Sequence, residues 1–166
     1  MSTNSIASDV KKSAEALGAQ LLSLGQKVTS AESCTGGGLA KAITAVAGSS
    51  QWFDCAFVSY SNSAKELLLG VNPEVIEKNG AVSVEVAEAM ALGAAKRAQA
   101  QLGIATSGIA GPGGGTTEKP VGTVCLAWAH HGIIAHSEVF HFDGDREQVR
   151  EQAIKTALQL ACKLLL

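Results

Sequence analysis

Helix-like and strand-like segments alternate along the first two-thirds of this chain, and this alternation most constrains its fold. Apolar runs at residues 27–31, 53–60 and 104–107 predict strands, of which 53–60 reads as buried and 104–107 as central. Runs at 121–129 and 133–142 predict a hairpin. Alternation favours a parallel sheet between helices, and a hairpin adds antiparallel strands. We therefore expect an α/β fold, a three-layer α/β/α arrangement with one mixed sheet covered by helices on both faces.

The segments between these strands have helical patterns. In the first, Ile6, Val10 and Leu17 recur at helical spacing. A length of 166 residues is near the common size of one domain, so we expect a single domain over residues 1–166. The predicted helices cover residues 5–24, 35–46, 63–69, 72–80, 83–100 and 146–164.

Charge and cysteine usage argue against several function classes. The net charge is -2 and no Lys/Arg cluster is present, which disfavours nucleic-acid binding. No apolar run approaches the ~20 residues of a membrane span, and no signal peptide is recognisable. The cysteines form no C-x-x-C pair, so we expect reduced thiols, no metal and a cytoplasmic location. They are Cys34, Cys55, Cys125 and Cys162.

The segment at residues 29–38 joins a predicted strand to a helix and is rich in small residues. A hydroxyl or thiol at such a junction is well placed to attack a carbonyl group, and the first amides of the helix can stabilise an oxyanion. Ser33 is one candidate nucleophile. Cys34 is the other, because a thiolate at a helix N-terminus is reactive. The alternative is that Ser33 and Thr35 only cap the helix.

A serine nucleophile needs a base, and the sequence offers a lysine. No Gly-x-Ser-x-Gly elbow is present, and all four histidines lie in or beside the hairpin, so a Ser-His-Asp triad is not supported. Tyr60 and Lys65 follow the second strand. Residues after strand ends gather at one edge of an α/β sheet, so both could face Ser33. A desolvated Lys65 could accept a proton near neutral pH, whereas the alternative is a solvated helix lysine.

A glycine-rich loop at residues 107–115 and an arginine pair offer sites for an anion. The loop lacks the Gly-Lys-Ser/Thr ending of a Walker loop and the strand-Gly-x-Gly-x-x-Gly-helix order of a dinucleotide fingerprint. Its amides could still bind a phosphate or carboxylate. Lys119 either reaches the same anion or is an ordinary loop residue. Arg146 and Arg150 lie one helical turn apart and could clamp a phosphate or pair with nearby glutamates.

These segments together resemble the CinA C-terminal-domain family over nearly the whole chain. The family implies a serine nucleophile at Ser33, a lysine partner at Lys65 and Tyr60 nearby. It implies hydrolysis of the carboxamide of nicotinamide mononucleotide to nicotinic acid mononucleotide and ammonia, in pyridine nucleotide recycling, without metal or cofactor. The matching stretches are AESCTGG, VSYSNSAKELLLGV, SGIAGPGGGTTEKPVGTV and FDGDREQVREQA.

With this mechanism, the expected partners are a small-molecule nucleotide and further copies of the chain, as a homodimer or larger assembly, with no nucleic acid and no membrane. The chain lacks the large amino-terminal domain of two-domain members, so we expect the stand-alone form. A non-catalytic nucleotide-binding module and a Cys34 amidase remain alternatives. The expected substrate-binding residues are Cys34, Thr35, Gly36, Gly37, Asn62, Ser107, Gly108, Ala110, Gly111 and Arg146.

Overall fold

The computed structural model describes residues 3–166, in which six α-helices and one short 3-10 helix (η1) surround a single five-stranded sheet. The order of elements along the chain alternates between helix and strand until the final hairpin. The elements are α1 (Thr3–Leu24), β1 (Val28–Glu32), α2 (Gly38–Thr44), η1 (Ser49–Gln51), β2 (Phe53–Val58), α3 (Asn62–Leu69), α4 (Pro73–Asn79), α5 (Val84–Ala98), β3 (Leu102–Gly108), β4 (Thr123–His130), β5 (Ile133–His141) and α6 (Arg146–Leu164).

The sheet is mixed, as expected. Its strand order is β2-β1-β3-β4-β5. Strand β1 pairs in parallel with both β2 and β3, whereas β4 pairs antiparallel with β3 and β5. Because β1, β2 and β3 are parallel, their carboxyl ends meet at one edge of the sheet, where ligands bind in open α/β sheets.

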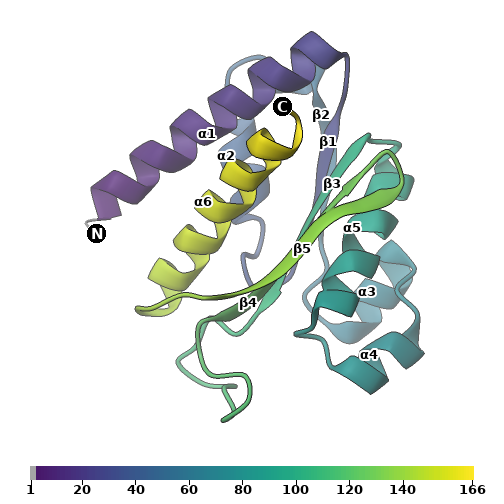
Figure 1. Cartoon of the computed structure of the whole chain (residues 1–166), viewed down its shortest axis with the longest axis vertical. Coiled ribbons are helices and arrows are strands. Elements are labelled where there is room, and N and C mark those ends of the chain that lie inside the picture. Colours follow the sequence, from purple (N-terminus) through teal and green to yellow (C-terminus); the bar gives the residue numbers. More distant parts are fainter. Residues whose placement is uncertain (1–2) are drawn as a thin grey trace.

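Helices cover both faces of the sheet, which confirms the three-layer prediction. Figure 1 shows α1, α2 and α6 on one face and α3, α4 and α5 on the other. Two apolar clusters correspond to these layers. One joins Leu17, Leu39 and Leu158 to the sheet, and the second joins Met90 and other α5 residues to the opposite face.

Two predictions about local structure were wrong. Strand β2 is an edge strand rather than a buried one, and all six of its residues are half-buried or exposed because no further strand pairs with it. Helix α2 begins only at Gly38, three residues later than the predicted start at residue 35. The delay is caused by Gly36 and Gly37, whose φ angles of 59° and 94° lie in the left-handed region, which is not helical. The turn before α2 therefore keeps Ser33 outside the helix.

Candidate active site

The turns that follow β1, β2 and β3 meet at the carboxyl edge of the sheet and carry the candidate catalytic residues. Glu32 at the end of β1 is in register with Val58 on β2 and Thr106 on β3. Ser33 therefore leaves the sheet beside the turn that leads into α3, the helix that carries Lys65. The amide of Ser33 donates to the carbonyl oxygen of Thr106 at 2.9 Å, which fixes the first residue of the turn.

Lys65 is buried, so the interpretation as a solvated helix lysine is wrong. It lies in α3 with only 1% of its surface exposed. Its Nζ atom lies 3.2 Å from Oγ of Ser33, 3.0 Å from the carbonyl oxygen of Ser59 and 3.4 Å from that of Tyr60. None of its hydrogen-bond partners within residues 3–166 is a carboxylate. Burial therefore lowers the pKa of Lys65 below the ordinary lysine value.

Ser33 and Thr35 do not cap α2, so the capping interpretation is also wrong. The N-cap position is Gly37, and no side chain of the cap residue bonds to the helix. The hydroxyl of Ser33 contacts Lys65 instead. The hydroxyl of Thr35 bonds to Glu32 at 2.7 Å and lies 2.7 Å from that of Thr106. Ser33 thus has no helix-capping role, and its hydroxyl faces the amine of Lys65.

A buried carboxylate that the sequence analysis missed, that of Glu32, reduces the number of backbone amides that are free to bind an oxyanion. The amide of Gly37 donates to this carboxylate, and the amide of Gly36 donates to the carbonyl oxygen of Ser33. Between residues 34 and 37, only the amides of Cys34 and Thr35 have no protein acceptor among the described residues. The signal for Glu32 was an acidic residue that ends an apolar strand directly before a glycine-rich turn.

Cys34 is a poor nucleophile in this structure. Its side chain is 5% exposed and belongs to the apolar cluster beneath α2. Burial, with a smaller contribution from Glu32 nearby, raises the pKa of the Cys34 thiol to about 11. A thiol with that pKa is protonated at neutral pH, so it lacks the thiolate that nucleophilic attack requires.

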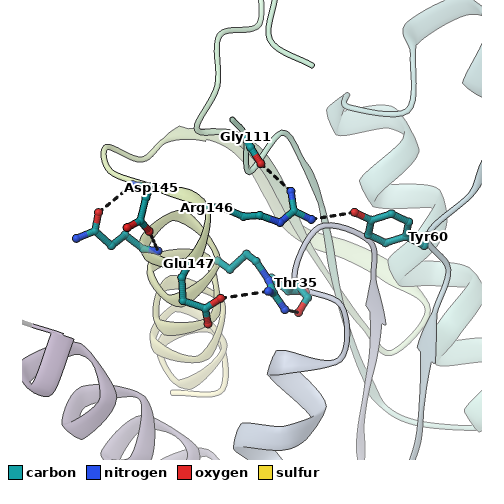
Figure 2. A network of polar contacts seen from close by, with 8 residues as sticks. Thr35, Tyr60, Gly111, Asp145, Arg146 and Glu147 are labelled. Carbon is teal, nitrogen blue, oxygen red and sulfur yellow. Dashed lines mark hydrogen bonds and ion pairs between the residues drawn. The ribbon is translucent and has the colours of Figure 1, made fainter. Parts of the chain in front are cut away.

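Arg146 joins two of the loops at the site instead of pairing with a glutamate. Its guanidinium donates to the carbonyl oxygen of Gly111 at 2.8 Å and to the hydroxyl of Tyr60 at 3.0 Å (Figure 2). Asp145 forms a capping box with Gln148 and thereby starts α6 at Arg146. Tyr60 is exposed, and its hydroxyl is directed to Arg146, whereas only its carbonyl oxygen contacts Lys65.

Arg150, one turn further along α6, binds a different loop. It donates to the carbonyl oxygen of Thr35 at 3.1 Å and pairs with Glu147 at 3.2 Å (Figure 2). The glutamate pairing expected as one alternative therefore applies to Arg150, while Arg146 keeps its contacts to Gly111 and Tyr60. The two arginines hold separate loops and do not form one clamp.

The remaining expected binding residues lie at the same edge but differ in accessibility. Ser107 is buried, and its hydroxyl donates to the carbonyl oxygen of Ala81 at 2.7 Å. Ala110 is 4% exposed and packs in the apolar core. Asn62 is exposed at the start of α3, and Gly108 ends β3. Lys119 is an ordinary structural loop residue, because its Nζ atom donates to two carbonyl oxygens beside α4.

Residues 3–166 contain no group of three or more histidine, cysteine, aspartate or glutamate side chains placed to hold a metal ion. Among the described helices, none is both long and apolar enough to cross a membrane.

Known proteins resemble this chain over most of its length. The chain is 52% identical over 147 residues to the nicotinamide-nucleotide amidohydrolase PncC of Enterobacter agglomerans, covering 89% of this chain and 90% of that protein. It is 49% identical over 152 residues to PncC of Escherichia coli (strain K12), covering 92% of each.

A solved structure has the same fold. The competence or damage-inducible protein from Enterobacter asburiae superposes with a TM-score of 0.91 and 38% identity, covering 95% of this chain and 98% of that one. The family model described as the CinA C-terminal domain matches residues 10–165. The resemblance seen in the sequence motifs is therefore confirmed, and the chain belongs to the CinA C-terminal domain family.

Proposed function

We propose that this chain is a nicotinamide-nucleotide amidohydrolase in which Ser33 is the nucleophile and Lys65 is its base. The reaction is the hydrolysis of nicotinamide mononucleotide to nicotinic acid mononucleotide and ammonia, a step that recycles pyridine nucleotides. This proposal is supported by relatives that are named for this activity and are 52% and 49% identical to this chain. The observation that carries the proposed residue roles is the buried Nζ atom of Lys65, 3.2 Å from the Oγ atom of Ser33.

The surroundings of Lys65 suit a neutral amine that accepts a proton. A neutral amine has two N–H bonds and one lone pair. The carbonyl oxygens of Ser59 and Tyr60 lie 3.0 and 3.4 Å from Nζ of Lys65, where they can accept hydrogen bonds from its two N–H groups. The lone pair is then directed at the hydroxyl of Ser33, which donates its proton when it attacks. Because burial lowers the pKa of Lys65, this neutral form is accessible closer to neutral pH.

The chemical steps follow from this pair. The Ser33 oxygen attacks the carboxamide carbon while its proton moves to Lys65, and a tetrahedral oxyanion forms. Lys65 then gives the proton to the amide nitrogen, ammonia leaves, and an acyl-serine ester remains. Lys65 next takes a proton from water, which attacks the ester carbon. The second tetrahedral intermediate then breaks its bond to the Ser33 oxygen, Lys65 returns the proton to that oxygen, and the acid is released. The unpaired amides of Cys34 and Thr35 are the proposed donors to the oxyanion.

The phosphate of the substrate is proposed to bind at Arg146 and the glycine-rich loop. Arg146 lies between Tyr60 and the Gly111 carbonyl at the edge that carries Ser33. A guanidinium has five N–H donors, so Arg146 keeps donors for an anion after making its two protein contacts. This mechanism requires no metal and no cofactor.

The setting of the enzyme is also a proposal. We infer a single domain in the cytoplasm, because the four cysteines are free thiols, as expected of a reducing compartment. We infer a homo-oligomer that binds neither nucleic acid nor membrane. The inference of a homo-oligomer is supported by exposed apolar side chains, such as Leu67 and Ile133, which are 76% and 70% exposed. Sedimentation analysis of the purified protein tests the assembly.

The decisive experiment is ammonia release from nicotinamide mononucleotide by the purified protein, with nicotinic acid mononucleotide identified as the second product. Ser33→Ala, purified in the same way, is the matched variant that tests the nucleophile. Equal ammonia release by wild type and Ser33→Ala would contradict Ser33 as the nucleophile. Nucleotide binding without ammonia release would instead favour a binding module.

A further inference from the structure

The buried carboxylate of Glu32 is surrounded by hydrogen-bond donors. It is 0% exposed at the end of β1, and five groups donate to it at distances from 2.7 to 3.1 Å. Two donors are hydroxyls and three are backbone amides at the start of α2. They belong to Ser30, Thr35, Gly37, Leu39 and Ala40.

Glu32 holds both ends of the turn that carries Ser33. Its main chain is fixed in the sheet, because its carbonyl oxygen accepts from the amide of Ser59 at 2.9 Å. Its side chain reaches across the turn to the first residues of α2, where the N-cap residue Gly37 has no side chain of its own to bond to the helix. Gly36 and Gly37 are conformationally free residues, so the turn needs an external constraint.

We propose that Glu32 is the positioning residue of the nucleophile: its carboxylate fixes the turn of residues 33–37 so that the Ser33 hydroxyl stays within reach of Lys65. This inference rests on the proposed function, because it assigns a role in the same reaction. Glu32 does not contact the reacting atoms. It acts through the backbone of the turn, whose displacement by roughly 1 Å can cost about 100-fold in rate.

The donor set requires a carboxylate and not an amide. Each oxygen of Glu32 accepts at least two hydrogen bonds, Oε1 from Ser30 and Ala40 and Oε2 from the other three donors. In Glu32→Gln, one oxygen becomes an NH₂ group, which cannot accept and faces at least two donors. Buried donors without an acceptor are unfavourable, so the turn must move to satisfy them.

The experiment removes the carboxylate and then returns it in solution. We expect Glu32→Gln and Glu32→Ala to lower kcat for nicotinamide mononucleotide by about 100-fold, with KM within about threefold of wild type. Acetate has the atoms that Glu32→Ala deletes. It should raise kcat of Glu32→Ala at least ~tenfold with saturation, whereas neutral acetamide and sodium chloride should not. Glu138→Gln, an exposed glutamate on β5, is the matched control and should retain wild-type kcat.

The outcomes separate positioning from general structural support. Circular dichroism and thermal melting establish which variants are folded. A folded Glu32→Gln with kcat within about threefold of wild type would overturn the proposal, and so would a folded, impaired Glu32→Ala that acetate does not rescue. If Glu32→Ala does not fold, Glu32→Gln decides alone. A native melting profile with reduced kcat and unchanged KM supports positioning, and a change in KM alone contradicts it.

A second readout keeps this inference distinct from the proposed function. Labelling of Ser33 by a sulfonyl fluoride, followed by mass spectrometry, reports nucleophile placement without the amide substrate. If wild type neither releases ammonia nor labels at Ser33, the proposed function has failed. If wild type does both and the Glu32 variants label at the wild-type rate, only the positioning role has failed.

Discussion

The Nζ atom of Lys65 lies 3.2 Å from the Oγ atom of Ser33, although the two residues are 32 positions apart in the chain. Ser33 follows a strand of the sheet, whereas Lys65 lies on the first turns of α3. Parallel pairing of β1 and β2 brings their carboxyl ends together and thereby creates this contact. Because Lys65 is buried beside a hydroxyl and two carbonyl oxygens, the pair is suited to proton transfer.

The first prediction separates the two candidate nucleophiles. Ser33→Ala should lower kcat for ammonia release by at least about 1,000-fold while the protein stays folded, because the attacking oxygen is lost. Cys34→Ala should keep kcat within about tenfold of wild type, because a buried thiol with a pKa of about 11 is protonated at neutral pH. Steady-state kinetics of both variants decide the matter. Loss of turnover in Cys34→Ala together with normal turnover in Ser33→Ala would favour the cysteine mechanism.

The second prediction concerns the protonation state of Lys65. In the proposed mechanism neutral Lys65 is the active form. The value of kcat/KM should then rise with pH through one ionisation that lies below the ordinary pKa of lysine, because burial lowers the pKa of Lys65. Lys65→Arg keeps a positive charge but cannot lose its proton at workable pH. It should therefore be at least ~100-fold slower, as should Lys65→Ala. Substantial activity of Lys65→Arg would show that only the charge matters and that Ser33 uses another base.

The third prediction is that catalysis is independent of metal ions. The proposed steps use only a hydroxyl, an amine and backbone amides, so incubation with a chelator and subsequent dialysis should leave kcat unchanged. Ammonia release before and after treatment is the measurement. A loss of activity that added zinc restores would contradict the serine mechanism as proposed.

The fourth prediction concerns the packing that places Lys65. Gly93 lies inside α5, and a Cβ atom there would clash with the carbonyl oxygen of Leu69 at the end of α3. Gly93→Ala should therefore destabilise the protein by about 1–3 kcal/mol, although alanine favours helix by ~1 kcal/mol. It should also lower kcat, because α3 carries Lys65. Urea unfolding and kinetics measure both effects.

The control for this prediction is Gly113→Ala. Gly113 is exposed, and a Cβ atom there has no neighbour within 4 Å. This variant should have a free energy of unfolding within about 1 kcal/mol of wild type. If Gly93→Ala were as stable as Gly113→Ala, α3 and α5 would have room for a Cβ atom at residue 93, and the prediction would be wrong.

Much of the fold could be predicted because the apolar pattern of each element agrees with its place in the layers. The alternation of helices and strands predicted the mixed sheet and its three layers. The edge position of β2 could not be predicted, because Phe53–Val58 is apolar enough for a central strand. Strand order depends on long-range pairing, which a local pattern does not record.

The site residues were predictable to a different extent. Ser33 and Lys65 were recognisable as candidates after strand ends, but their separation depends on the parallel register of β1 and β2. Glu32 was missed because its importance appears only when the turn at Gly36 and Gly37 folds the start of α2 back over it. Contacts of this kind follow from backbone geometry and not from residue spacing.

The last prediction concerns Arg146, which links the turn after β2 to the glycine-rich loop. Its contacts to Tyr60 and Gly111 hold the guanidinium at the edge of the sheet that carries Ser33 (Figure 2). Tyr60→Phe removes the partner of one N–H donor and leaves the other contact in place. Tyr60→Phe should therefore affect the rate less than Arg146→Ala does, if Tyr60 only orients the arginine.

Arg146→Ala should lower kcat/KM for nicotinamide mononucleotide at least tenfold, because a hydrogen bond to a charged group contributes roughly 1.5–3 kcal/mol and ~1.4 kcal/mol is one decade. Nicotinamide riboside, which lacks the phosphate, should be a poorer substrate of wild type by a similar factor and should lose little more in Arg146→Ala. Arg97→Ala, an arginine of α5 that contacts Leu67, is the matched control and should keep wild-type kinetics on both substrates. Kinetics of the three proteins on both substrates complete the test, and equal use of mononucleotide and riboside by wild type would refute phosphate recognition at Arg146.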